Sequence, residues 1–240
     1  MSPMGDHIVK SYDDELKRLN ATLARMGGLA EHQMGGAIQS LVRRDEILAT
    51  NIIRADAEVD ALQTEVDEFC VALLARRQPM ASELREDVSA IRVSGDLERI
   101  ADLAANIAKR SVALVQMPAS PLVPAVARIG RLSRQMIKDV LDAYLENSTE
   151  KAMAVWESDT EVDALYTSLF RELLTYMMED PRNITTCTHL LFIAKNMERI
   201  GDHATNIAET VYFQVTGERM EAGRPKADTS SFAVVLPEDE

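Results

Sequence analysis

The stretch DLERIADLAANIA at residues 96–108 returns 100 residues later as NMERIGDHATNIA at residues 196–208. A second pair of segments repeats in the same order, because DAEVDAL at residues 56–62 matches DTEVDAL at residues 159–165. Self-similarity at a nearly fixed period indicates that one structural unit has been duplicated. We therefore expect two copies of one unit, each carrying the same acidic segments.

Apolar residues recur every three or four positions through most of the chain, which predicts helices. The predicted helices span residues 12–43, 45–77, 82–115, 123–146, 150–178 and 183–215. Proline-containing breaks separate them, above all at residues 117–121. The expected fold is therefore all-α, with two tandem three-helix bundles related by internal duplication.

The predicted domain boundaries follow from these breaks. The first three-helix bundle covers residues 1–116 and the second covers residues 122–216. A charged, Gly- and Pro-containing segment over residues 217–240 reads as a mobile tail. Paired glycines at 27–28 and 35–36 lie inside the first helix, which favours close packing against neighbouring helices.

Composition narrows the class of protein. Hydrophobic residues make up 46% and charged residues 27% of the chain, which is typical of a globular protein. The net charge of −13 repels phosphate backbones, so we expect no nucleic-acid binding. Neither a secretion signal nor an apolar run of membrane-spanning length is present, which predicts a cytoplasmic protein. Cys70 and Cys187 fall within helical patterns and are expected to be buried free thiols.

The repeated segments place carboxylates four residues apart, where side chains on a helix are neighbours. Both copies carry one such pair on each of two helices. The eight carboxylates are Asp56, Asp60, Glu98, Asp102, Asp159, Asp163, Glu198 and Asp202. Like charges at this spacing repel, and a cluster of them calls for a cation. Because all-oxygen sites suit hard ions, we predict that these residues hold metal ions such as Mg²⁺, Ca²⁺, Mn²⁺ or iron.

Other interpretations of the carboxylates stay open. They could form solvated ion pairs with Arg99, Arg199 and Lys195 on a purely structural helical adaptor. A metal-dependent hydrolase or oxidase is the enzymatic alternative. A ferritin-like di-iron site is excluded because Glu-x-x-His is absent, with Ala101 and Gly201 at the required positions. His203 has no counterpart in the first copy and is expected to make a local hydrogen bond. No catalytic motif is recognised, so we predict no catalytic residues and no enzyme.

Three stretches give the chain a resemblance to a known family. LERIAD at residues 97–102, MERIGDHATNIAE at residues 197–209 and RQPMASELR at residues 77–85 resemble the PhoU family of phosphate-transport regulators. The resemblance covers residues 8–217. It implies two three-helix bundles arranged end to end.

The resemblance also implies a function. The acidic motifs of the family hold iron or zinc in some members and Mg or Mn in others. By this resemblance Glu98, Asp102, Glu198 and Asp202 would hold metal, with the four aspartates of the other repeated segment opposite. The implied role is negative control of phosphate uptake and of phosphate-responsive signalling. The implied partners are the ATPase subunit of a phosphate ABC transporter, a sensor histidine kinase and a second copy of the chain, with membrane association only through partners.

Overall fold

Six long helices form the chain in the computed structural model, which describes residues 3–220 and 228–230, with side chains from Asp14 onward. The helices are α1 (Pro3–Arg43), α2 (Glu46–Arg77), α3 (Ser82–Val115), α4 (Val123–Glu146), α5 (Thr149–Glu179) and α6 (Ile184–Thr216). A short 3₁₀ turn, η1 (Pro181–Asn183), precedes α6. Each predicted helix is confirmed, with α1 beginning earlier than expected.

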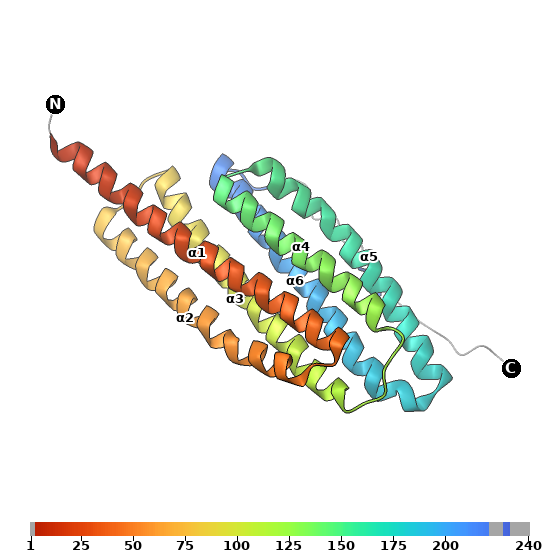
Figure 1. Ribbon diagram of the computed structural model, residues 1–240. Helices are drawn as coiled ribbons and strands as arrows, with labels where there is room; N and C mark the ends of the chain where they lie inside the picture. The colour runs from red at the N-terminus through yellow and green to blue at the C-terminus, as the bar shows by residue number, and fades with distance from the viewer. Residues whose placement is uncertain (1–2, 221–227, 231–240) are drawn as a thin grey trace.

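The helices form two three-helix bundles, as Figure 1 shows. Helices α1, α2 and α3 pack on one another, and α4, α5 and α6 do the same. The expected fold class is therefore confirmed. No strand occurs in the described ranges, and no helix in them is long and apolar enough to cross a membrane.

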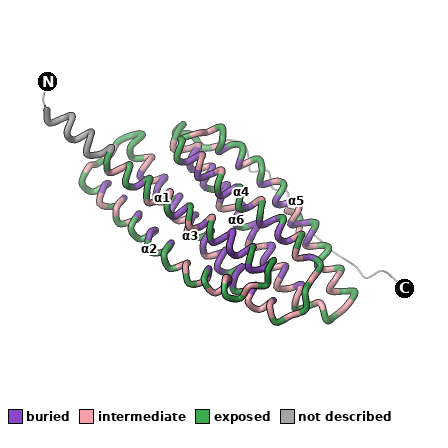
Figure 2. Tube along the Cα trace, viewed as in Figure 1, coloured by how far each residue is buried: buried purple, intermediate pink, exposed green. Residues whose placement is uncertain are grey.

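The end-to-end arrangement implied by the resemblance is wrong. The two bundles lie side by side, because α3 packs along α6 and α1 packs along α4. Helices α3 and α6 run in opposite directions, since Arg85 near the start of α3 contacts Gln214 near the end of α6. At the other end Thr186 of α6 contacts Met117 just beyond α3. Buried residues accordingly follow the sides on which the helices face one another (Figure 2).

Glycines allow the closest approaches between the bundles. A Cβ added to Gly27 would meet Leu141 of α4, and one on Gly130 of α4 would lie 2.9 Å from the Ile38 Cγ1 atom of α1. Gly35 and Gly36 also face neighbouring side chains, whereas Gly28 faces open space. The expectation of close packing at the paired glycines is thus confirmed at three of the four positions.

Turns and caps fix the helix ends. Ser148 caps α5 by accepting a hydrogen bond from the Lys151 amide. Arg44, in a left-handed conformation, donates to the backbone oxygens of Val115 and Met117 at the end of α3. These two bonds tie the turn between α1 and α2 to the start of the connection between the bundles, and they satisfy carbonyls that a helix end leaves without partners.

Candidate functional site

The first acidic face consists of Asp56 and Asp60 on α2 with Glu98 and Asp102 on α3. In the structure the other three carboxylates lie close enough to Asp56 for their charges to act on it. Burial raises the pKa of Asp56 to about 6, and the charges of Asp102, Asp60 and Glu98 add to this rise against a lowering by Lys109. The sequence prediction that α2 and α3 present their carboxylates to each other is therefore correct for this half.

Asp56 is the member of the first acidic face whose ionised form is least compensated by its surroundings. Its Oδ1 atom is buried and has no hydrogen-bond partner among the described residues. Glu98 is also perturbed, because burial and then Asp102 raise its pKa while Arg99 lowers it. Arg99 bridges Glu98 at 3.5 Å and Asp102 at 3.8 Å, but the Arg99 side chain is 62% exposed. An exposed pair of this length compensates little of the repulsion.

Two features of these residues suit a bound cation. They carry negative charge, and the buried Asp56 Oδ1 atom has no hydrogen-bond partner among the described residues. They are not yet arranged as a ligand set, since no group of three or more His, Cys, Asp or Glu in the described ranges has metal-holding geometry. A cation at this face would therefore require side-chain rotations that turn the carboxylates toward a common point.

The second acidic face consists of Asp159 and Asp163 on α5 with Glu198 and Asp202 on α6. It is more enclosed than the first face, because Asp159, Asp163 and Glu198 are all buried. Gly201 makes this possible, since a Cβ there would lie only 2.9 Å from Asp159 Oδ1.

A cation from the chain itself occupies the second acidic face. The Lys195 ammonium lies 2.8 Å from Glu198 Oε1. Burial raises the pKa of Glu198 to about 7, and Lys195 limits the rise while Asp202 adds to it. The interpretation of these acids as lysine ion pairs therefore describes Glu198 well. This face suits an added metal ion less than the first face does.

The two neighbouring glutamates of the repeats behave as surface residues. Glu58 pairs with Arg25 of α1 at 2.6 Å, and Glu161 pairs with Arg128 of α4 at 3.6 Å. All four side chains are largely exposed. The acidic residues of these repeats thus include outward ion pairs, the buried Asp159, Asp163 and Glu198, and the exposed Asp60.

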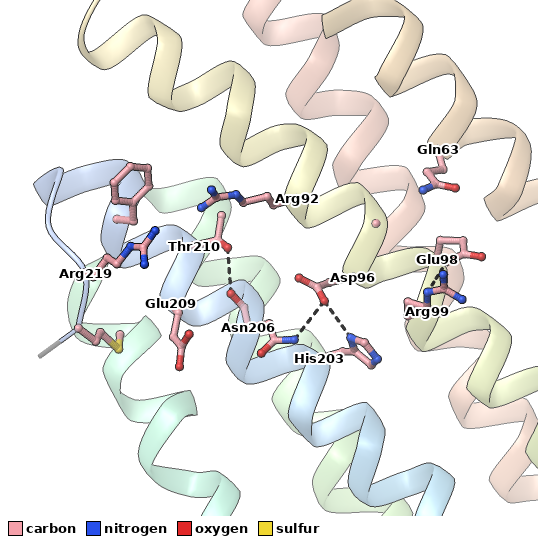
Figure 3. Close-up of a pocket in the computed structure, with 13 residues that line it drawn as sticks. Gln63, Arg92, Asp96, Glu98, Arg99, His203, Asn206, Glu209, Thr210 and Arg219 are labelled. Carbon is pink, nitrogen blue, oxygen red and sulfur yellow. Dashed lines mark hydrogen bonds and ion pairs between the residues drawn. The ribbon is translucent and has the colours of Figure 1, made fainter. Parts of the chain in front are cut away.

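A cavity of about 640 Å³ opens beside the first acidic face, between α3 and α6 (Figure 3). Its walls include Glu98, Arg92 and Arg219, and its floor carries a polar bridge between the bundles. In that bridge Asp96 Oδ1 lies 2.8 Å from His203 Nδ1 and accepts a hydrogen bond from Asn206. The expected hydrogen-bonding role of His203 is confirmed, although its partner lies in the other bundle.

Sequence reasoning missed this bridge because it depends on how the two bundles pack. A signal was nevertheless present. Asp96 corresponds to Asn196 in the repeat, and His203 corresponds to Leu103. Two of the three bridge residues therefore lie at positions where the copies differ, whereas Asn206 has an identical equivalent in Asn106. The cysteine prediction, by contrast, is confirmed, since Cys70 and Cys187 are both buried and free.

Comparisons with known proteins agree with this architecture. The chain is 50% identical over 229 residues to the phosphate-specific transport system accessory protein PhoU homolog of Caulobacter vibrioides, covering 95% of this chain and 100% of the relative. The corresponding homolog of Rhizobium meliloti is 49% identical, with 94% of this chain and 95% of the relative covered.

A solved structure shares the fold. The crystal structure of PhoU from Pseudomonas aeruginosa superimposes with a TM-score of 0.84 at 39% identity, covering 86% of this chain and 100% of that one. The PhoU domain family matches residues 23–111 and again residues 126–211, one match in each bundle. The chain is therefore a member of the PhoU family, with one PhoU domain in each half.

Proposed function

We propose that this protein is a non-enzymatic negative regulator of phosphate uptake and of phosphate-responsive signalling. In this role it couples the ATPase subunit of a phosphate ABC transporter to a sensor histidine kinase at the cytoplasmic side of the membrane. The names of its relatives support a place in the phosphate-specific transport system. Those relatives are named accessory proteins, which favours a regulator over a hydrolase or oxidase.

One observation supports this proposal further: Arg99 and Lys109 offset only part of the negative charge of the first acidic face. The buried Asp56 oxygen has no hydrogen bond within the described part of the chain, and burial together with three neighbouring carboxylates raises the pKa of Asp56. A bound cation or a basic partner surface would lower the free energy of this face. We infer that Asp56, Asp60, Glu98 and Asp102 hold a divalent or trivalent ion, with iron, zinc, Mg²⁺ and Mn²⁺ as candidates. A metal supplies positive charge there and a point to which a partner can bind. The second face would take a metal less readily because of Lys195.

The regulator also fits a homodimer, which we propose as its assembly state. The described surface carries exposed large apolar residues such as Ile47, Val71 and Met80. Such residues are compatible with contacts to another copy or to a partner, and light scattering of the purified chain measures the assembly directly.

The test compares two double variants in binding to purified transporter ATPase and to the cytoplasmic part of the kinase. Asp56→Asn with Asp102→Asn removes two of the four negative charges of the first acidic face. Glu58→Gln with Glu161→Gln removes the same charge from exposed ion pairs and is the matched control. Loss of binding and of bound metal only in the first variant supports the proposal. Equal binding by wild type and both variants contradicts it, and phosphatase turnover that requires Asp102 would favour the enzyme.

A further inference from the structure

A short segment beyond α6, residues Asp228–Ser230, lies against the second acidic face. The Asp228 carboxylate receives Lys195 Nζ at 3.1 Å through Oδ2 and the Thr167 hydroxyl at 3.3 Å through Oδ1. The Asp228 amide donates to Asp163 Oδ2 at 3.2 Å. One residue of the segment therefore contacts both α5 and α6 with its side chain and its backbone.

All three amides of the segment have hydrogen-bond acceptors. The Thr229 amide donates to the Thr167 hydroxyl oxygen at 3.2 Å, and the Ser230 amide donates to Asp228 Oδ1 at 2.8 Å. The last bond closes a tight turn of the kind that aspartate favours. Burial alone would raise the pKa of Asp228, but hydrogen bonds from Ser230 and Lys195 outweigh it and lower the pKa. The contact is thus a specific docking arrangement.

The first half lacks the side chain that makes this docking possible. The repeat places Gly95 where the second half has Lys195. Thr64 corresponds to Thr167, yet its hydroxyl donates to the Asp60 carbonyl oxygen of its own helix. The second face therefore has one ammonium group, from Lys195, and a contact with Asp228–Ser230, whereas the first face has no equivalent ammonium at position 95.

We propose that the Asp228–Ser230 segment is an intramolecular cap that competes with the partner for the second acidic face. This inference rests on the proposed function, because it assumes that the acidic faces bind a partner. The cap uses a carboxylate and backbone amides to occupy Lys195, Thr167 and Asp163. A partner must displace the cap before it reaches those side chains, so the second acidic face is less accessible to a partner than the first.

The first measurement reads the cap without any partner. Acetylation of Lys195 by acetic anhydride, followed by mass spectrometry of the full chain, reports access to its ammonium group. Asp228→Ala removes the carboxylate, and Thr167→Val removes the hydroxyl that joins two residues of the cap. Thr64→Val is the matched control at the repeat-equivalent position. We expect faster acetylation of Lys195 in the first two variants and the wild-type rate in the control.

The second measurement uses the purified transporter ATPase as the probe in biolayer interferometry. A cap docked nine-tenths of the time lowers apparent affinity about tenfold, so its loss raises affinity by that factor. We expect this gain for Asp228→Ala, which changes only the cap, and none for Thr64→Val.

Each outcome decides between the alternatives. Unchanged Lys195 acetylation would show that the segment does not cap the face. Faster acetylation with unchanged affinity would show a purely structural contact, and both results overturn the proposal. Absence of binding by every form, wild type included, would overturn the proposed function and the competition with it, while Lys195 acetylation would still report whether the segment docks.

Discussion

Neutralising Asp56 should stabilise the metal-free protein above pH 6. Its pKa is raised from 3.8 to about 6 in the folded state, so the ionised carboxylate disfavours folding. A shift of this size corresponds to about 3 kcal/mol for a fully buried group, at about 1.36 kcal/mol per unit. Because the side chain is only partly buried, solvent screening reduces the expected gain for Asp56→Asn to about 1 kcal/mol.

The sign of the effect sets its pH dependence. Between pH 4 and pH 6 the unfolded chain loses this proton before the folded chain does, so wild-type stability falls as the pH rises. The gain for Asp56→Asn is therefore present at pH 8 and absent at pH 4. Urea unfolding of the metal-free protein at both pH values measures it.

A matched control lies two residues along the same helix. Glu58→Gln breaks an exposed ion pair with Arg25, so we expect a change within about 0.5 kcal/mol. If Asp56→Asn is no more stable than wild type at pH 8, or gains equally at pH 4, the like-charge argument for the first acidic face is refuted.

Two further variants test the interior. Asp87 is fully buried, neither of its carboxylate oxygens has a hydrogen bond in the described part of the chain, and burial followed by Glu86 raises its pKa to about 6. We expect Asp87→Asn to stabilise the protein by up to about 3 kcal/mol at pH 8 and not at pH 4, as measured by urea unfolding. An added side chain at Gly130 meets Met197 at 2.8 Å, so Gly130→Val should cost about 1–3 kcal/mol through overpacking, which a lowered calorimetric melting temperature would show. An unchanged melting temperature would contradict the close packing of α4 on α6.

The repeat and the helical period were enough to predict the elements of the fold. Apolar spacing and the breaks at Pro79 and Pro181 depend only on local sequence, so five of the six helices have bounds within a few residues of those predicted. Helix α1 begins at Pro3 rather than residue 12, because a proline at the first helical position fits the turn and the apolar pattern starts only later.

The way in which the two bundles pack could not be predicted from local sequence patterns. Whether the bundles lie end to end or side by side depends on contacts between residues far apart in the chain, such as Asp96 with His203. The carboxylates of the first half were correctly predicted to be neighbours on facing helices. The sequence did not predict that the two acidic faces differ in their ion pairs, because Lys195 and Asp228 come into contact only in the folded chain. The prediction of a mobile tail falls mainly on residues outside the described ones, and Asp228–Ser230 is docked.

The antiparallel packing of α3 on α6 gives the chain the symmetry of a two-fold dimer whose subunits have been fused through residues 116–122. In an unfused dimer every substitution appears on both subunits at once. Fusion removes that constraint, so position 195 can carry lysine while position 95 remains glycine. A single polypeptide can in this way evolve two unlike recognition surfaces from one ancestral surface.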